Sequence, residues 1–197
     1  IGSSSKRKHE KNLADSRDSV TTVCVGSAGG VDGPRIYLPK GKVLEFNNLK
    51  NFTDHHNAPS GSCVEMTPNA YMTDEAWVAV TPSICKGIRA MEVISDHPDF
   101  WVVFSLDGFG SHLDVTALQI FSDHKILVVK EEGDTSQVSQ AYVQMVARAD
   151  KMATRELLDG YKLHTKHMIS QFELVLVINE ALNKVQKSQA WRKSFIR

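Results

Sequence analysis

Three things are scarce or missing in this sequence, and each absence argues against a class of protein. Cysteines number only three, and such an odd, scattered set predicts neither a disulfide framework nor a zinc site, which fits a reducing compartment. No apolar run approaches the ~20 residues that a membrane-spanning helix needs, and because the first residues are polar we expect no signal peptide. Basic and acidic residues balance at 23 each, so net charge gives no argument for a nucleic-acid partner. We therefore expect an intracellular protein, nuclear or cytoplasmic, without a membrane anchor.

What is present suffices for one good-sized domain. The 197 residues are 42% hydrophobic and 23% charged, which is typical of a soluble globular protein. Residues 1–19 are polar and charged, and we interpret them as a poorly ordered segment before a domain at residues 20–197. Their basic triplet, residues 6–8, is either a plain surface run or a phosphate contact or nuclear address. Because the first residue is Ile1 rather than Met, we expect a piece of a longer protein.

The stretch from Phe100 to Leu113 organises the rest of the chain. Its first five residues are all apolar, which predicts a strand that is buried on both faces. Asp107 follows this strand and is itself followed by Gly108 and Gly110. Open α/β sheets place their chemistry at such strand ends, and glycines there let a ligand approach the backbone closely. The alternative interpretation is an Asp-Gly turn that simply ends the strand.

The first part of the domain predicts a small antiparallel sheet. Val20–Val25 is β-branched and predicts a strand, and Arg35–Leu38 and Val43–Phe46 are short enough and apolar enough to be its partners. The glycines in Gly26–Gly33 indicate a turn, because neither a Gly-Lys-Ser/Thr sequence nor a helix follows them, as a phosphate-binding loop would require. Asn47–Met66 has the composition of a loop.

Helices and a second strand are predicted around the central stretch. A helix is expected to begin after Thr73, which can cap it, and Pro82 is expected to break or kink it before Ile84–Met91 continues as a helix. Leu113–Ser122 predicts a helix and Lys125–Lys130 a compact apolar strand. Strand, helix and strand in this order predict a βαβ unit with two parallel strands.

The remainder of the chain is predicted to be helical and locally basic. One helix is expected from Thr135 or Ser136, and amphipathic helices are expected at Phe172–Leu182 and Ala190–Phe195. Residues 151–197 contain nine basic side chains against four acidic ones, a surplus of five. This surface either faces DNA or RNA or consists of ordinary solvated helix faces.

Several of these segments resemble DDE-type transposases of the pogo/mariner kind. Val20–Gly30 together with Leu38–Lys42 is similar to the early strands of that family. Leu106–His112 resembles the segment around the second catalytic aspartate, and Thr135–Val143 resembles the segment that carries the third. Ala190–Phe195 is similar to a later family helix. The resemblance covers most of the chain and implies an α/β fold of the ribonuclease-H-like kind, a mixed sheet flanked by helices.

The resemblance also implies a chemistry and a site. Two Mg²⁺ ions about 3.5–4 Å apart can activate the attacking oxygen and stabilise the leaving oxygen at phosphorus. Mg²⁺ or Mn²⁺ would be the cofactor, DNA the partner, and a homo-oligomer is left open. Asp107 is the expected catalytic and metal-binding carboxylate, with Ser111 and His112 beside it.

Two departures from the family pattern predict an incomplete site. The strand that carries the first aspartate precedes Val20 in the family, and nothing in residues 1–19 has the pattern of that strand. At the third position stands Val143, which cannot bind a metal. The possible supporting acids follow the second strand; they are Glu131, Glu132 and Asp134. Three hypotheses stay open: a DNA-binding remnant, an enzyme that is active when upstream sequence is present, and a degenerate copy without function.

Overall fold

A computed structural model of the protein describes residues 19–41, 56–106, 114–130, 147–164 and 169–187. Five strands lie in these ranges: β1 (Val20–Gly26), β2 (Asp32–Pro39), β3 (Cys63–Val64), β4 (Val102–Leu106) and β5 (Ile126–Lys130). The helices there are α2 (Asp74–Arg89), α3 (Glu92–Ser95), α4 (Val115–Asp123), α5 (Ala147–His164) and α6 (Gln171–Lys187).

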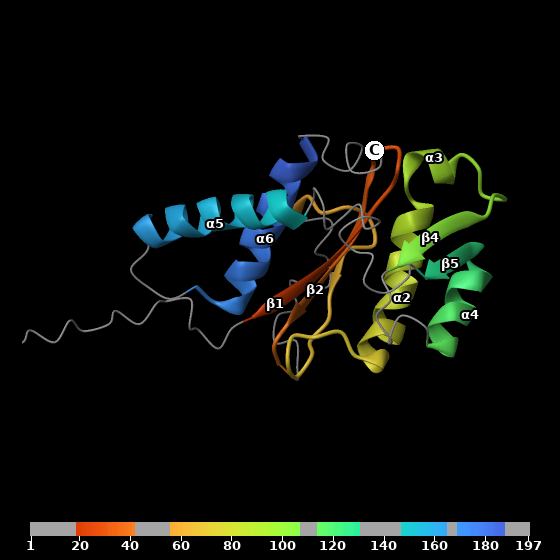
Figure 1. Ribbon diagram of the computed structural model, residues 1–197, viewed down its shortest axis with the longest axis horizontal. Helices are drawn as coiled ribbons and strands as arrows, with labels where there is room; N and C mark the ends of the chain where they lie inside the picture. Colours follow the sequence, from red (N-terminus) through yellow and green to blue (C-terminus); the bar gives the residue numbers. More distant parts are fainter. Residues whose placement is uncertain (1–18, 42–55, 107–113, 131–146, 165–168, 188–197) are drawn as a thin grey trace, which may run out of the picture.

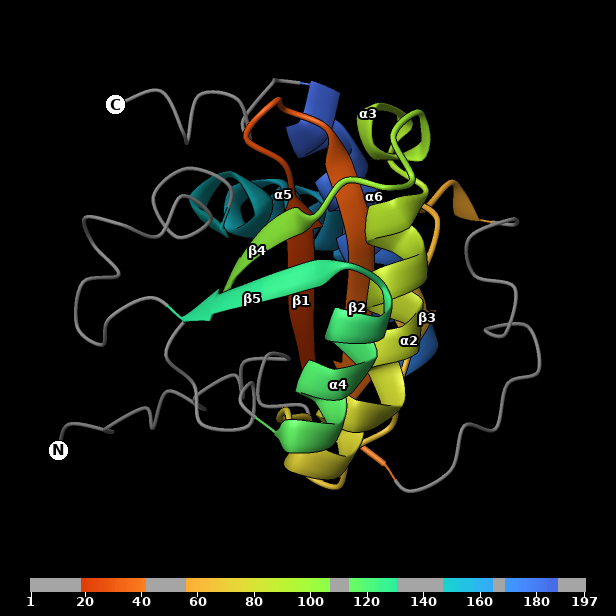
Figure 2. The same cartoon turned by 90° about the vertical axis from the view of Figure 1, so that its right-hand side faces the viewer.

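The β1–β2 hairpin separates the described elements into two groups. Helices α5 and α6 lie on one side of the hairpin, and α2, α4, β4 and β5 lie on the other (Figure 1). A view from that second side shows α4 and the two strands β4 and β5 in front of the hairpin (Figure 2). The hairpin is therefore a middle layer with a covered surface on each face.

The hairpin reaches both sides because its side chains alternate. β1 and β2 pair antiparallel, with Val23 opposite Ile36, and β3 adds to β2 as a short parallel strand. Successive side chains of a strand point to opposite faces. Ile36 and Leu38 of β2 accordingly join the apolar cluster with α2, whereas Tyr37 joins the cluster with α6. The fully buried Arg35 lies on the Tyr37 face.

Helix α2 is one continuous helix across its proline. Thr73 caps its first turn by accepting a hydrogen bond from the amide of Ala76 at 3.2 Å, and acidic residues follow in that turn. Pro82 lies inside the helix without ending it. Pro82 has no backbone N–H and so cannot donate to the preceding turn. The hydroxyl of Thr81, the residue before it, donates to the carbonyl of Trp77 at 2.7 Å and adds a hydrogen bond in that turn.

Helix α2 also approaches the neighbouring loop closely at two glycines. Gly61 has a positive φ of 79°, a backbone conformation that side chains disfavour. Gly87 lies directly against the carbonyl of Ser60 and the ring of Pro34, so that an added Cβ would overlap both. The helix therefore packs on the hairpin at a distance that only a glycine permits.

Strands β4 and β5 form a parallel pair joined by α4. Their register is continuous from Val102 opposite Ile126 to Leu106 opposite Lys130. Asp114 caps α4 by accepting hydrogen bonds from the amides of Thr116 and Ala117. This is the βαβ unit that the sequence predicts.

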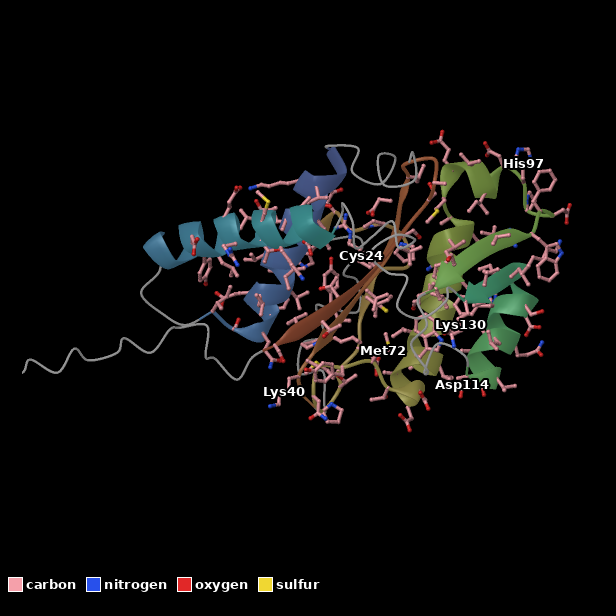
Figure 3. All side chains as sticks on the ribbon, viewed as in Figure 1. Cys24, Lys40, Met72, His97, Asp114 and Lys130 are labelled. Carbon is pink, nitrogen blue, oxygen red and sulfur yellow. The ribbon has the colours of Figure 1, made fainter. Side chains whose placement is uncertain are left out.

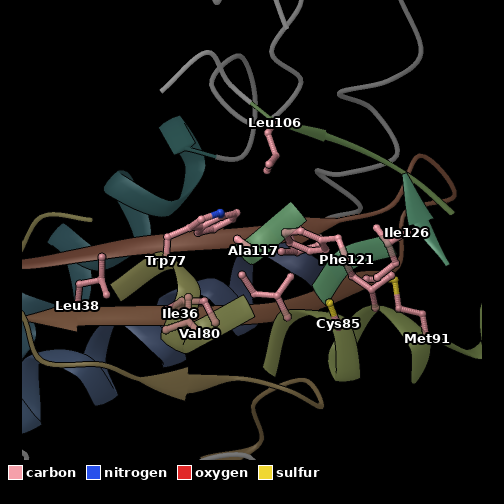
Figure 4. Packing of buried hydrophobic residues seen from close by; sticks show 13 residues of the cluster. Ile36, Leu38, Trp77, Val80, Cys85, Met91, Leu106, Ala117, Phe121 and Ile126 are labelled. Carbon is pink, nitrogen blue, oxygen red and sulfur yellow. The ribbon is translucent and has the colours of Figure 1, made fainter. Parts of the chain in front are cut away.

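One apolar core, which we call the α2 core, joins the hairpin to this unit. Trp77 is fully buried and packs against Phe121 of α4 with ring centroids 6.0 Å apart (Figure 4). Leu106 and Ile126, from β4 and β5, belong to the same cluster as Ile36 of β2. Burial of apolar surface in this core is the main term that holds the two strand groups together.

Several predictions from the sequence are confirmed and others need correction. The α/β class, the antiparallel hairpin and the parallel β4–β5 pair are confirmed. The prediction that the strand after Phe100 is buried on both faces is wrong, because Val103 of β4 is 66% exposed and only the other face of the strand packs on the α2 core. The described strands, however, form two separate sheets, β1–β2–β3 and β4–β5, and not one mixed sheet. Cys63–Val64 is a strand where a loop was predicted. Of the two outcomes expected at Pro82, a break or a kink, the break is wrong, because α2 continues through the proline and buried residues on both sides of it pack into the core. The predictions for residues 1–18, Val43–Phe46 and Ala190–Phe195 lie outside the described residues.

Candidate functional site

All six candidate site residues lie outside the described residues. Asp107, Ser111 and His112 fall in the interval 107–113, after β4. The possible supporting acids fall in the interval 131–146, after β5; they are Glu131, Glu132 and Asp134. What the structure does place is the pair of strand ends from which both intervals start.

These two strand ends lie side by side. Leu106, the last residue of β4, is the register partner of Lys130, the last residue of β5. Leu106 is buried in the α2 core, and Lys130 is exposed at the end of its strand. Lys130 and Asp114, the residue that precedes α4, are both labelled in Figure 3. The carboxyl ends of adjacent parallel strands are the usual place for a ligand site in an α/β sheet.

The opposite ends of β4 and β5 are fixed to α2 by one arginine. The guanidinium of Arg89 donates to the carbonyl of Phe100 at 2.9 Å, just before β4. It also donates to the carbonyls of His124 and Lys125, each at 2.7 Å, in the turn before β5. One side chain therefore ties the entry points of both strands to the same helix, and this supports the register between them.

A second cluster of polar residues lies on the other face of the hairpin, and we call it the Arg35 network. The side chain of Arg35 is completely buried and donates to Asp32 at 2.9 Å. From α6, the side-chain oxygen of Asn179 accepts from Arg35 at 2.6 Å and from the hydroxyl of Tyr37 at 2.9 Å. The side-chain oxygen of Asn183, one turn further along α6, accepts from Arg35 at 3.0 Å. Asp32, Arg35, Tyr37, Asn179 and Asn183 thus join β2 to α6.

The environment of the network shifts the pKa values of two neighbouring groups. Burial raises the pKa of Tyr37, although the positive charge of Arg35 acts in the opposite direction. Burial likewise raises the pKa of Asp150 on α5, and a hydrogen bond from Thr154 and the charge of Arg35 partly offset this effect. Tyr37 is therefore a neutral hydrogen-bond donor at physiological pH.

The Arg35 network is suited to holding β2 and α6 together and not to binding a ligand. The terminal guanidinium nitrogens of Arg35 are engaged by protein oxygens, so they do not offer an open anion site. Only Nε has no hydrogen-bond partner within the described ranges. No group of three or more His, Cys, Asp and Glu side chains that could hold a metal ion occurs in that part of the chain either. None of its helices is both long and apolar enough to cross a bilayer.

Reasoning from the sequence missed this network, although two signals point to it. Arg35 is a charged residue at the start of a predicted strand whose other members, Ile36, Tyr37 and Leu38, are apolar or aromatic. Asn179 stands on the apolar face of α6, between Val175 and Leu182 at helical spacing. A polar side chain on an apolar face usually has a buried partner, and here two such residues face each other.

Comparison of the chain with protein-family models, with curated proteins and with solved structures finds no match.

Proposed function

We propose that this chain is a DNA-binding domain derived from a DDE-type transposase or endonuclease and that it is catalytically incomplete. The observation that supports this best is the register of β4 and β5. Leu106 and Lys130 are partners at the ends of parallel strands, and in the sequence each is followed directly by a candidate acid, Asp107 and Glu131. In the transposases that this chain resembles, the second catalytic aspartate likewise follows a strand of the sheet.

The proposal includes a ribonuclease-H-like fold that the two sheets would share. Within the described ranges, β1 pairs only with β2, and β4 pairs only with β5. Strands that follow one another in a chain usually pair. A strand that precedes Val20, as the family's first aspartate strand does, would therefore pair with the open edge of β1. Placed there, it could also join β4 and unite the two sheets.

Catalytic incompleteness is argued from the number of ligands. Mg²⁺ and Mn²⁺ are bound through oxygen, and a two-metal site needs several carboxylates held in fixed positions. Asp107 is the one family carboxylate that this chain carries in its expected place, because residues 1–19 lack the pattern of the first aspartate's strand and Val143 occupies the third position. A metal held by Asp107 would lack the fixed geometry that in-line displacement at phosphorus needs.

Exposed basic side chains on the C-terminal helices are the proposed DNA contacts. Lys151 and Arg155 are exposed one turn apart on α5, and Lys184 is exposed on α6. Such side chains bind phosphates without selecting a base sequence. Binding by this surface should therefore be electrostatic and only weakly specific.

The binding test is the salt dependence of affinity for duplex DNA, measured by fluorescence anisotropy between 50 and 200 mM salt. We expect affinity to fall steeply with salt, and we expect the Lys151→Gln/Arg155→Gln double variant to lower the slope by about two. Lys86→Gln, at an exposed position on α2, is the matched control and should leave the slope unchanged. Salt-independent binding, strict selection of one short sequence, or no binding at 50 mM salt would contradict the proposal.

The catalytic test is incubation with supercoiled plasmid and Mn²⁺. We expect no nicking by the wild-type chain, and Val143→Asp should strengthen metal binding without restoring cleavage. Asp107→Ala is the control. Nicking by the wild-type chain that this control abolishes would favour the alternative function, an active divalent-metal endonuclease in which Glu131, Glu132 or Asp134 completes the site.

A further inference from the structure

We infer that α5 and α6 form one unit that detaches from the hairpin while the α2 core stays folded. The Arg35 network is the contact that holds this unit on the hairpin. This inference does not rest on the proposed function. It concerns the way in which the two faces of the hairpin are covered.

Among the residues that the structure describes, the two sides of the hairpin share no buried core residue. The α2 core contains Trp77, Ile84 and Phe121, together with the hairpin residues that face them. The cluster under α6 contains Tyr37, Val64 and Ala58 with Val175, Ile178 and Leu182, and a third cluster around Val185 joins α6 to α5. Loosening the second and third clusters therefore removes no side chain from the first.

The helix pair is connected more strongly within itself than to the rest of the chain. α5 packs mainly on α6, and α6 makes most of the contacts of the pair with β1 and β2 (Figure 1). α5 reaches the hairpin where Ala149 and Ala153 pack with Val185 near Cys24 of β1. The hydroxyl of Tyr161 on α5 donates to Glu173 on α6. The two helices should therefore detach from the hairpin together or remain on it together.

The contact between α6 and the hairpin includes buried polar side chains that share hydrogen-bond partners. Asn179 accepts from both Arg35 and Tyr37, and its side-chain amide donates to the carbonyl of His56 at 2.7 Å. Loss of this one side chain removes the nearest acceptor of Arg35, at 2.6 Å, and an acceptor of the Tyr37 hydroxyl, and leaves Arg35 on α6 with the main-chain carbonyl of Asn179 at 3.2 Å and the side chain of Asn183. Weakening hydrogen bonds of buried groups is costly. A buried charged network also contributes less net stability than apolar packing of the same size. The α6 side is thus the weaker of the two attachments.

Hydrogen exchange measured by mass spectrometry on the whole chain tests the inference. Proteins open in cooperative units of different stability, and exchange resolves them. Under native conditions, amides of α5 and α6 should exchange at least 10-fold faster than amides in the middle of α2. Asn179→Ala should accelerate exchange in α5 and α6 by about 10- to 100-fold and leave α2 unchanged. Asn183→Ala, which removes a single acceptor, should give a smaller effect of the same kind and serves if Asn179→Ala does not fold.

The matched variant on the other side is Ile84→Val, a mild change in the fully buried α2 core. It should accelerate exchange in α2 and leave the faster exchange of α5 and α6 as it is. A thiol reagent gives an independent readout, because Cys24 packs under α6 and Cys85 is buried in the α2 core. Asn179→Ala should speed the labelling of Cys24 and not that of Cys85. A common exchange rate for α2 and α6, or an equal response of both to Asn179→Ala, would overturn the inference.

Discussion

The two faces of the β1–β2 hairpin are covered in physically different ways. The α2 face is closed by apolar side chains, among them Trp77, Phe121 and Ile84, which are all fully buried. The α6 face combines apolar contacts with a buried guanidinium that is held by acceptors from two elements. Apolar packing depends on volume and tolerates substitutions of similar size. A polar network depends on every partner at once, so single changes should affect it in a coupled manner.

The largest effect is expected from Trp77→Ala on the apolar face. Deleting a fully buried indole removes its transfer free energy and leaves a cavity, which costs about 3–5 kcal/mol of unfolding free energy. Urea denaturation followed by circular dichroism measures this loss. Met152→Ala, at a residue that is 58% exposed on α5, is the control and should cost less than about 0.5 kcal/mol. A loss of less than 1 kcal/mol for Trp77→Ala would show that the apolar face does not carry the main core.

Coupling on the polar face is the second prediction. In a double-mutant cycle, Arg35→Met and Asn179→Leu should each destabilise the chain, because each leaves buried partners unsatisfied. The double variant should cost less than the sum of the two, with a coupling energy of about 1–3 kcal/mol. The same cycle on Val80→Ala and Ile126→Val in the α2 core should be more nearly additive. Strict additivity for Arg35 and Asn179 would show that their 2.6 Å contact contributes little.

The start of α4 provides a smaller effect. Asp114 accepts from two backbone amides of its own helix at 2.8 and 3.2 Å. Asp114→Ala should therefore cost about 1 kcal/mol, and Asp114→Asn, which keeps an acceptor oxygen, should retain most of that stability. Thermal unfolding of the three proteins measures the difference. Equal losses for both variants would mean that the acceptor oxygen does not stabilise the helix.

The smallest effect concerns Asp150, which lies near the Arg35 network. Its pKa is raised in the folded chain, mainly by burial, so the folded state binds the proton more tightly than the unfolded state. That stabilisation is present below the unfolded pKa of about 3.9 and is lost as pH rises through the folded value. Asp150→Asn should therefore match the wild type near pH 4 and exceed its stability at pH 7 by no more than ~1 kcal/mol. Urea denaturation at both pH values is the measurement, and a less stable variant at pH 7 would show that attraction to Arg35 outweighs burial.

Local sequence patterns predicted much of the fold. The β-branched run from Val20 and the apolar run Phe100–Phe104 predicted strands, and strands are found at Val20–Gly26 and Val102–Leu106. Thr73 was expected to cap α2, and it does. Ser170 was overlooked as a helix start: its hydroxyl accepts from the amide of Glu173, whose carboxylate accepts in return from the amide of Ser170. This reciprocal pattern is a capping box, and the spacing alone could have revealed it.

The candidate site was less accessible to prediction. The sequence places acids after each strand of a βαβ unit, and this led to Asp107 and Glu131. The structure adds that Leu106 and Lys130, the residues before them, are register partners. The Arg35 network could not be predicted as a unit because Arg35 and its partner Asn183 are separated by 148 residues in the chain. Periodicity assigns a residue to a face of its own element but does not reveal which element covers that face.

The sequence by itself determined the local features of this protein: its α/β class, the antiparallel hairpin, the parallel strand pair and the capped start of α2. These depend on backbone preference and on side-chain period, which act over a few neighbouring residues. The tertiary structure alone decided that Pro82 stays inside a helix, that the described strands form two sheets, and that Arg35 meets Asn179 across the hairpin. Those outcomes depend on packing between distant segments, and the free energy of such packing exceeds the local preferences that would oppose it.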